Sequence, residues 1–163
     1  MEYLIGIDIG TSGTKSVLFD TNGNTVASAT AKYPMYQPKN GWAEQNPADW
    51  WHAVCDTLKS VSKKACGKIC GIGISGQMHG LVMLDENNEV IRDAIIWCDS
   101  RTSKECGDIE NSVGHDRLLE ITGNPALAGF TASKIMWVKK HEPQNFKRCR
   151  HILLPKDYIR FML

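Results

Sequence analysis

The stretch Tyr3-Leu-Ile-Gly-Ile-Asp-Ile-Gly-Thr-Ser-Gly-Thr-Lys15 decides the fold of this chain. Its apolar run Tyr3–Ile7 predicts a buried strand that carries Asp8 at its end, and a turn rich in Gly, Thr and Ser then closes at Lys15. A second strand begins at Ser16. A carboxylate, backbone N–H groups, hydroxyls and a cation in this order are the groups needed to hold a metal-bound polyphosphate.

Two glycines shape this turn. Gly10 and Gly13 are expected to take positive φ angles and to let the backbone approach an anion closely. Because a strand follows the turn and no Gly-Lys-Ser or Gly-Lys-Thr element occurs, the pattern differs from the Gly-rich loops that open a helix. An ordinary β-hairpin with a Gly-rich turn accounts for the same residues, so the motif alone leaves phosphate binding undecided.

The composition indicates a folded globular protein and limits the classes of partner that it can bind. The 163 residues are 42% hydrophobic and 23% charged, which predicts one sizeable core and about one domain. The formal net charge is +1 without a concentrated basic block, which argues against nucleic-acid binding. The chain lacks a run of about 18 apolar residues and a basic N-terminal segment with a cleavage site. We therefore expect neither a membrane span nor secretion, and a cytoplasmic location.

The six cysteines are spread along the chain, which favours reduced thiols over a disulfide framework. Cys66 and Cys70 are spaced C-x3-C, but they have no second pair and no close His partner. Structural zinc needs four ligands, so we expect no zinc site.

Hydrophobic patterning predicts a mixed α/β sheet with helices packed on it. The turn Asp20–Asn24 should lead into a third strand, which makes an antiparallel three-stranded unit at the N-terminus. Asn46 and Pro47 should begin a helix to about residue 65, and Ile69–Ile74 indicates a short buried strand. Further elements are expected as strands at 25–33, 81–84, 90–97 and 151–154, and as helices at 102–112, 115–121, 132–140 and from 155. Ser100 or Thr102 is expected to cap the first of these helices. The apolar end at 158–163, without a polar tail, leads us to expect a truncated domain.

A second polar motif, Ser75-Gly-Gln-Met-His-Gly80, directly follows the strand expected at 69–74. Polar loops at the ends of central strands are where α/β sheets place ligands. Gln77 and a neutral His79 can each donate and accept a hydrogen bond, and Met78 offers an adaptable apolar wall, which together suit a polyol. Taken alone, His79 is explained more simply as a loop histidine satisfied by protein or solvent.

The opening hairpin resembles the first phosphate-binding hairpin of the actin, Hsp70 and sugar-kinase superfamily. Three blocks in order resemble the xylulokinases of the FGGY carbohydrate kinase family: Asp8-x-Gly-Thr-x-x-x-Lys15, Ser75-Gly-Gln-Met-His-Gly80 and Trp97-Cys-Asp-Ser-Arg101. Gly129–Val138 and Leu154–Tyr158 are similar to later blocks. Gln-Met-His-Gly is the most discriminating element, because glycerol kinases of the family carry a charged sequence there. Ser133 stands where proline is common, a minor departure.

The resemblance implies an RNase H-like α/β fold of the actin/hexokinase/Hsp70 superfamily, with two domains and a cleft between them. Residues 1–163 would be an incomplete N-terminal domain. The remainder of that domain, with the family's catalytic base, and the adenine-binding C-terminal domain would lie outside the chain. We therefore expect the isolated chain to be inactive.

The resemblance also implies ATP-dependent transfer of the γ-phosphoryl group to the 5-hydroxyl of D-xylulose, which gives D-xylulose 5-phosphate. Asp8 would be the catalytic residue that orients Mg²⁺. The phosphates would be held by Thr11, Ser12, Gly13, Thr14 and Lys15. The sugar would be contacted by Gln77, Met78, His79, Trp97, Asp99 and Arg101. A surface role explains Lys15 equally well, and Asp99 with Arg101 could instead brace the loop as an ion pair.

Two alternatives stay open at this point. The substrate could be another ketose or polyol, such as ribulose or glycerol, although the Gln-Met-His-Gly loop argues against these. The chain could instead be a non-catalytic sugar- or nucleotide-binding module or part of an Hsp70-like ATPase. The sequence does not decide the oligomeric state, and a homodimer remains open.

Overall fold

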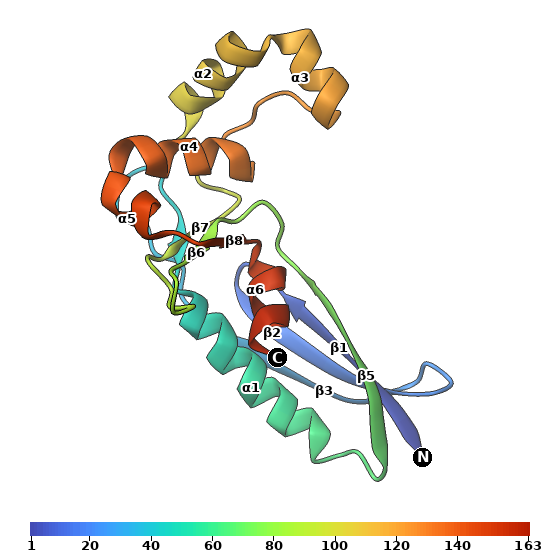
Figure 1. Cartoon of the computed structure of the whole chain (residues 1–163). Helices are drawn as coiled ribbons and strands as arrows, with labels where there is room; N and C mark the ends of the chain where they lie inside the picture. The colour runs from blue at the N-terminus through green and yellow to red at the C-terminus, as the bar shows by residue number, and fades with distance from the viewer. The chain divides into compact units, whose positions relative to one another are not determined.

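The computed structural model describes all residues 1–163, which form two compact units (Figure 1). The sheet unit comprises Met1–Met35, Asn46–Met78 and Pro155–Leu163. The helical unit comprises Tyr36–Gln45 and His79–Leu154. The prediction of one sizeable core was wrong. The length of the chain does not reveal that the chain leaves the sheet unit and later returns to it.

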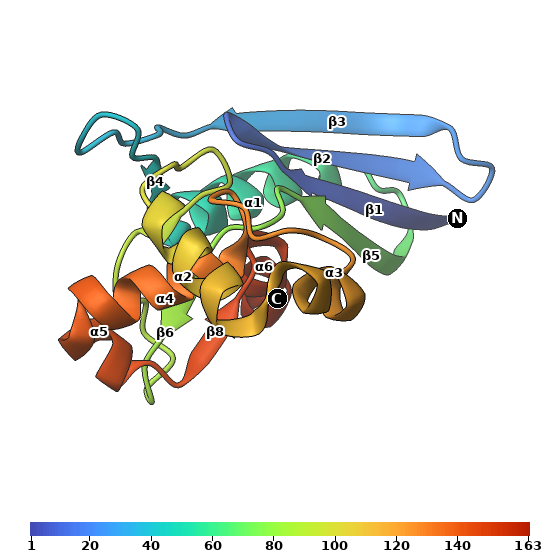
Figure 2. The ribbon, with the colours of Figure 1, turned by 90° about the horizontal axis from the view of Figure 1, so that it is seen from above.

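The sheet unit contains a four-stranded sheet in the order β3-β2-β1-β5, as Figure 2 shows. Its strands are β1 (Glu2–Ile9), β2 (Gly13–Asp20), β3 (Thr25–Lys32) and β5 (Lys68–Gly76). β1, β2 and β3 are antiparallel, as predicted, and β5 runs parallel to β1. The prediction that β5 is buried was wrong: it lies at the edge of the sheet, where Ile72 is 46% exposed.

Buried and exposed side chains alternate along β1, so the sheet has one buried face and one open face. Tyr3, Ile5, Ile7 and Ile9 point to the buried face of β1, and successive side chains on a strand point to opposite faces. The helices of this unit are α1 (Pro47–Ser62), which packs on β2 and β3, and α6 (Pro155–Met162), which packs on α1 and β5. Asp8 therefore projects from the open face.

Helix α1 begins where the sequence predicts. The side chain of Asn46 accepts a hydrogen bond from the N–H of Ala48, and Pro47 occupies the first turn. The helix turns Trp50, Val54 and other apolar side chains toward the sheet. It ends at Ser62, a few residues before the end expected at about residue 65.

The helical unit joins short strand pairs to four helices. Its strands are β4 (Glu44–Gln45), β6 (Val82–Leu84), β7 (Ala94–Ile95) and β8 (His151–Leu153). Its helices are α2 (Ser103–Val113), α3 (His115–Thr122), α4 (Thr131–His141) and α5 (Pro143–Arg148). β4 pairs with β7 and β6 pairs with β8, both antiparallel. Leu81, Met83, Ile95, Trp137 and Val138 form the core cluster of this unit.

The helical unit differs from the sequence predictions in three respects. The strand expected at 90–97 is reduced to Ala94–Ile95, since Val90 makes only an isolated bridge to Leu84. β4 and α5 were not predicted. Thr102 stands at the start of α2 without capping it, because its hydroxyl is engaged by Ala128 O and by the hydroxyl of Ser133. None of the helices has the length and apolar character that a bilayer crossing requires, and the six cysteines are all free thiols.

Candidate active site

The two polar motifs of the sequence begin at the same edge of the sheet. β1 and β5 are parallel, so their carboxyl ends lie side by side, with Ile9 opposite Gly76. The N–H of Gln77 donates to Ile9 O at 2.8 Å. A Cβ on Gly76 would lie 2.9 Å from the same carbonyl, so glycine permits this close approach. The Gly-rich turn after β1 and the start of the loop after β5 are therefore neighbours.

A hollow of ≈ 480 Å³ opens on the uncovered face of the sheet beside this edge. It is lined by residues of β1, β2 and β5, among them Asp8, Lys15 and Ser75. Asp8 and Lys15 face each other across the β1–β2 pair, and Asp8 is also level with Ser75 on β5. Most of its lining is glycine and apolar side chains, so a charged ligand and its counter-ion would be held through the carboxylate of Asp8, the ammonium of Lys15 and the hydroxyl of Ser75.

The turn itself differs from expectation in its glycines and in Thr14. Neither Gly10 nor Gly13 has a positive φ angle. Gly13 is needed for backbone packing, because a Cβ there would lie 2.6 Å from Ala31 O. The turn is closed by the Gly10 N–H, which donates to Gly13 O at 3.0 Å. Thr14 and Lys15 already belong to β2.

Thr14 braces the turn from inside. Its side chain is buried, and its hydroxyl donates to the hydroxyl of Tyr33 at 3.4 Å. Among the predicted phosphate contacts, Ser12 is exposed and Thr11 and Gly13 are half-buried. The hydroxyl of Thr14 does not face the solvent, and we leave it out of the proposed phosphate contacts.

Tyr33 is a further bracing residue, which sequence reasoning missed. Its hydroxyl donates to Gly10 O at 2.6 Å and so ties the end of the third strand region to the turn. Burial raises the pKa of Tyr33, and the nearby charge of Asp8 acts in the same direction, while the hydrogen bond from Thr14 lowers it. A tyrosine at the end of a predicted strand carries no signal of this contact.

The loop after β5 presents Met78 and holds His79 firmly. Met78 is 58% exposed, so its side chain is accessible to a ligand. His79 takes a positive φ of 62°, a conformation that costs a residue with a Cβ about 1–2 kcal/mol. Its ring stacks on Phe130 with centroids 4.4 Å apart. Its carbonyl accepts a hydrogen bond of 2.8 Å from the ammonium of Lys134.

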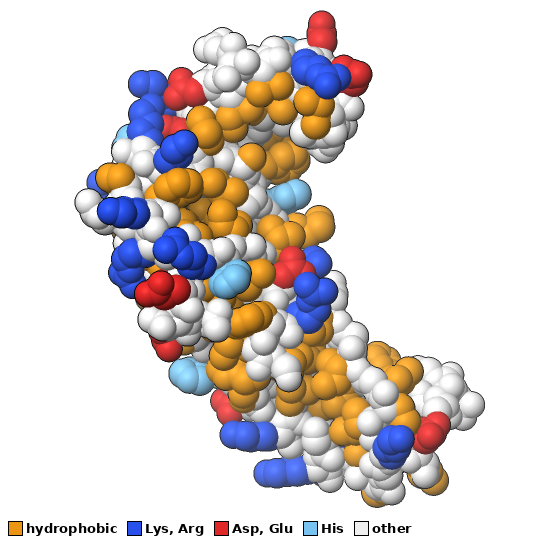
Figure 3. Space-filling view, in the orientation of Figure 1, with side chains coloured by type: hydrophobic (Ala, Val, Ile, Leu, Met, Phe, Trp, Pro, Cys, Tyr) orange, Lys and Arg blue, Asp and Glu red, His pale blue; other side chains and the backbone are white.

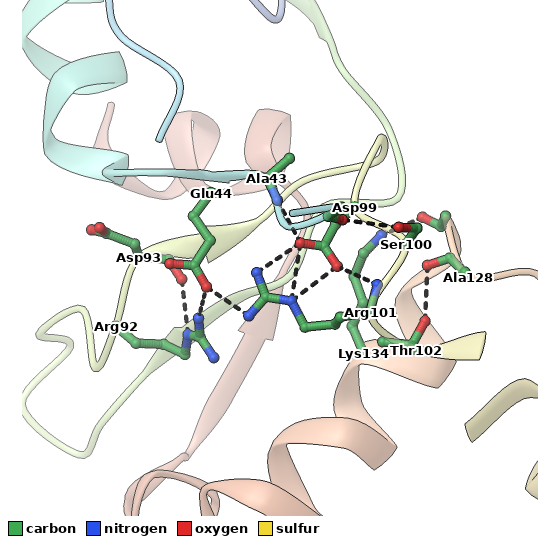
Figure 4. Close-up of polar contacts among 12 residues, drawn as sticks. Ala43, Glu44, Arg92, Asp93, Asp99, Ser100, Arg101, Thr102, Ala128 and Lys134 are labelled. Atoms are coloured by element: carbon green, nitrogen blue, oxygen red, sulfur yellow. Dashed lines mark hydrogen bonds and ion pairs between the residues drawn. The ribbon is translucent and has the colours of Figure 1, made fainter. Parts of the chain in front are cut away.

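Asp99 and Arg101 form a buried ion pair. Arg101 Nη2 lies 2.7 Å from Asp99 Oδ2, and both side chains are almost fully buried. Asp99 also accepts hydrogen bonds from the backbone N–H of Ala43 at 2.6 Å and of Arg101 at 3.0 Å (Figure 4). With its oxygens so engaged, Asp99 braces the loop, and we leave the pair out of the proposed sugar contacts. Trp97, by contrast, is 49% exposed.

The ion pair extends into a larger charged network. Arg101 Nη1 lies 2.7 Å from Glu44 Oε1, an ion pair without hydrogen-bond geometry. Glu44 also bonds to Arg92, whose Nη1 reaches Glu142 Oε1 at 2.6 Å. The guanidinium of Arg101 lies 3.7 Å from the centroid of the Trp42 ring. Trp42 thus contributes a cation–π contact to this network.

The basic side chains on α4 and α5 are explained by their positions at the C-terminal ends of these helices. Figure 3 shows Lys and Arg gathered over α4 and α5 on the face displayed, with acidic side chains among them. Lys139 and Lys140 lie in the last turn of α4, and Lys147 and Arg148 in the last turn of α5. Cations are favourable at helix C-termini, so these positions require no ligand.

Comparison with known proteins identifies the class and then the family. A solved ligand-bound xylulose kinase from Lactobacillus acidophilus matches 100% of this chain with a TM-score of 0.94 and 34% identity, over 33% of its own length. A solved gluconate kinase from the same organism matches 99% of the chain with a TM-score of 0.93 and 34% identity, over 33% of its length. The fold is that of sugar kinases of the actin/hexokinase-like class.

The family model for the N-terminal domain of the FGGY family of carbohydrate kinases matches residues 3–163. The chain belongs to this family. The xylulose kinase of Bacillus subtilis (strain 168) is 47% identical over 166 residues, which cover 100% of this chain and 33% of the relative. The chain therefore spans about a third of the length of the curated relatives that it matches.

Replacing Tyr33 by Phe should loosen the turn after β1. The change removes the donor to Gly10 O, and the net loss for one such hydrogen bond is about 1 kcal/mol of unfolding free energy. Urea unfolding measures the loss, and hydrogen exchange should rise at residues 10–13. Tyr3→Phe is the matched control, because that hydroxyl meets only the sulfur of Met1 at 3.4 Å. Equal effects of the two changes would contradict the bracing role.

Replacing Arg101 by Met should destabilise the helical unit strongly. Removal of the guanidinium leaves the buried Asp99 carboxylate without its ion-pair partner, at a cost of about 3–5 kcal/mol. Arg117→Met is the control, since Arg117 and Glu120 form an exposed pair on α3 and such pairs contribute little. Thermal unfolding of both variants measures the difference. If the two midpoints fall by the same amount, the buried pair does not brace the loop.

Proposed function

We propose that the protein carrying this chain is an ATP-dependent kinase that transfers the γ-phosphoryl group to the 5-hydroxyl of D-xylulose. The observation that carries the proposal is the shared edge of β1 and β5, where the Asp8 turn and the Gln-Met-His-Gly loop begin side by side. The name of the Bacillus subtilis relative supports xylulose as the substrate. We expect the reaction to take place in the cytoplasm.

The hollow at Asp8 suits the phosphates of a nucleotide with its magnesium ion. No three His, Cys, Asp or Glu side chains of the chain are grouped as ligands for a metal ion. Mg²⁺ usually keeps several waters and uses one or two carboxylates together with substrate phosphates, so one exposed carboxylate fits it. When bound, the ion would neutralise charge that develops on the phosphates. Asp8 would orient it, and Lys15 would add positive charge.

The turn after β1 would hold the phosphates from the other side. Ser12 is exposed at its tip and offers a hydroxyl, and Thr11 and Gly13 flank it. The hydrogen bonds of Gly10 and Tyr33 hold the turn in one conformation before the ligand arrives. Phosphoryl transfer depends mainly on positioning and charge neutralisation, so a rigid turn is an advantage.

The sugar would be bound by the loop after β5 and by Trp97. Gln77 and His79 would donate and accept hydrogen bonds with the hydroxyls, which each need both. Met78 and Trp97 are exposed apolar side chains that can cover the carbon skeleton. We assign no catalytic base to this chain and expect the 163 residues alone to be inactive.

A sugar acid is a second substrate class that the test should include. The gluconate kinase and the xylulose kinase of Lactobacillus acidophilus match this chain with the same identity, 34%. Overall similarity to these structures therefore does not distinguish a ketose from a sugar acid as the substrate. The choice depends on the side chains of the loop, which contains no Lys, Arg, Asp or Glu from Gln77 to Gly80.

The test is a substrate panel with the full-length protein. A coupled assay for ADP should compare D-xylulose, D-ribulose, glycerol and D-gluconate at equal concentrations with Mg-ATP. We expect kcat/KM to be highest for D-xylulose, with the product phosphorylated at the 5-hydroxyl as read by NMR. A higher kcat/KM for any other compound would overturn the substrate assignment, and no turnover with any of them would overturn the kinase assignment.

Replacing His79 by Ala in the full-length protein should affect the sugar and spare the nucleotide. Loss of a hydrogen bond to a neutral hydroxyl is worth roughly 1 kcal/mol, or about fivefold in the KM of D-xylulose. The KM of ATP should stay close to that of the wild type. Substitution of His52, an exposed residue on α1, by Ala is the control and should change neither constant. Unchanged xylulose kinetics in His79→Ala would remove His79 from the sugar site.

A further inference from the structure

The segment Gly129–Lys134, which leads into α4 and forms its first turn, contacts two of the proposed sugar-binding residues. We call it the clamp segment. Phe130 stacks on the ring of His79, and Lys134 donates to the carbonyl of His79. A Cβ on Gly129 would lie 2.9 Å from Trp97 O, so the backbone of the clamp segment packs directly against Trp97.

Lys134 is an unusual group to find in the interior. Its side chain is fully buried, although lysine is almost never buried unless it is paired. Its ammonium donates to two backbone carbonyls, His79 O at 2.8 Å and Gly129 O. Burial lowers the pKa of Lys134 to about 8, while the charge of Asp99 acts in the opposite direction. An apolar side chain would fill the same space without this penalty, so the contacts of the ammonium explain its presence.

His79 needs such contacts because its backbone conformation is strained. Its φ of 62° lies in the left-handed region, which persists only where the surroundings hold it. The ammonium fixes the carbonyl of His79 and Phe130 fixes the plane of its ring. These two contacts come from one segment and restrain the two ends of the same residue.

We propose that Lys134 and Phe130 are positioning residues that hold His79 in its sugar-binding orientation. The proposal rests on the proposed function, in which His79 contacts the sugar. Neither side chain is assigned a contact with the substrate. The clamp segment instead lowers the cost of binding, because His79 does not have to be ordered when the sugar arrives.

The experiment compares Lys134→Met with Lys139→Met in the full-length protein. Lys139 lies on the same helix and is exposed, so it controls for loss of a lysine from α4. We expect Lys134→Met to raise the KM of D-xylulose by up to about fivefold, the effect of losing the His79 side chain itself, with the KM of ATP unchanged. Lys139→Met should leave both constants unchanged. An unchanged KM for the sugar in Lys134→Met, or an equal rise for sugar and ATP, would overturn the proposal.

Phe130→Leu keeps the proposal testable if Lys134→Met does not fold. This change removes the stacked ring and keeps an apolar side chain, and it should raise the KM of D-xylulose by roughly threefold without affecting that of ATP. Hydrogen exchange at residues 78–80, measured without substrate, should increase in the same variant. No increase in exchange and no change in the KM of the sugar would refute the clamp.

The exchange measurement also separates this inference from the proposed function. If the wild type phosphorylates no sugar, the proposed function fails, whereas faster exchange at His79 in Phe130→Leu would still show the restraint. If the wild type is active and neither variant alters the sugar constants or the exchange, only the clamp fails.

Discussion

The parallel pairing of β1 with β5 is the constraint on which the site depends. β1 carries Asp8 at its end, and β5 leads into the loop that contains Gln77 and Met78. Parallel strands end at the same edge of a sheet, so residues nearly seventy positions apart in the chain become neighbours. The alternation along β1 buries Ile5, Ile7 and Ile9 and leaves Asp8 on the open face. Backbone pairing and burial together therefore present a carboxylate beside a polar loop.

Polar side chains that are buried or half-buried then fix loops within each of the two units. Tyr33 holds the carbonyl of Gly10, Lys134 holds the carbonyl of His79, and Asp99 holds the N–H of Ala43. Buried polar groups are costly unless they are paired, and when paired they rigidify their surroundings. In each case the partner is a backbone group of a loop, which has no regular ladder to hold it. The residues proposed to bind ligands are thus distinct from the residues that keep them in place.

Local sequence signals predicted much of the fold. The three antiparallel strands and the Asn46 cap follow from local signals, which are alternating apolar residues and a capping side chain followed by proline. The sequence did not predict that β5 is an edge strand, because an apolar run looks the same at the centre and at the edge of a sheet. Tyr33 and Lys134 were missed because their partners lie far away in the chain. The sequence allowed Asp99 and Arg101 either to contact the sugar or to brace the loop as an ion pair. Their burial in the structure favours the second role.

The central claim is that Asp8 and the hollow of the sheet hold the metal–nucleotide phosphates. A crystal structure of the full-length protein with Mn²⁺ and a non-hydrolysable ATP analogue tests it most directly, since the anomalous signal of manganese locates the ion independently of the protein model. We expect the peak in the hollow beside Asp8, with the terminal phosphates against the turn at residues 10–13. A manganese peak and phosphates bound away from the ends of β1 and β2 would contradict the account.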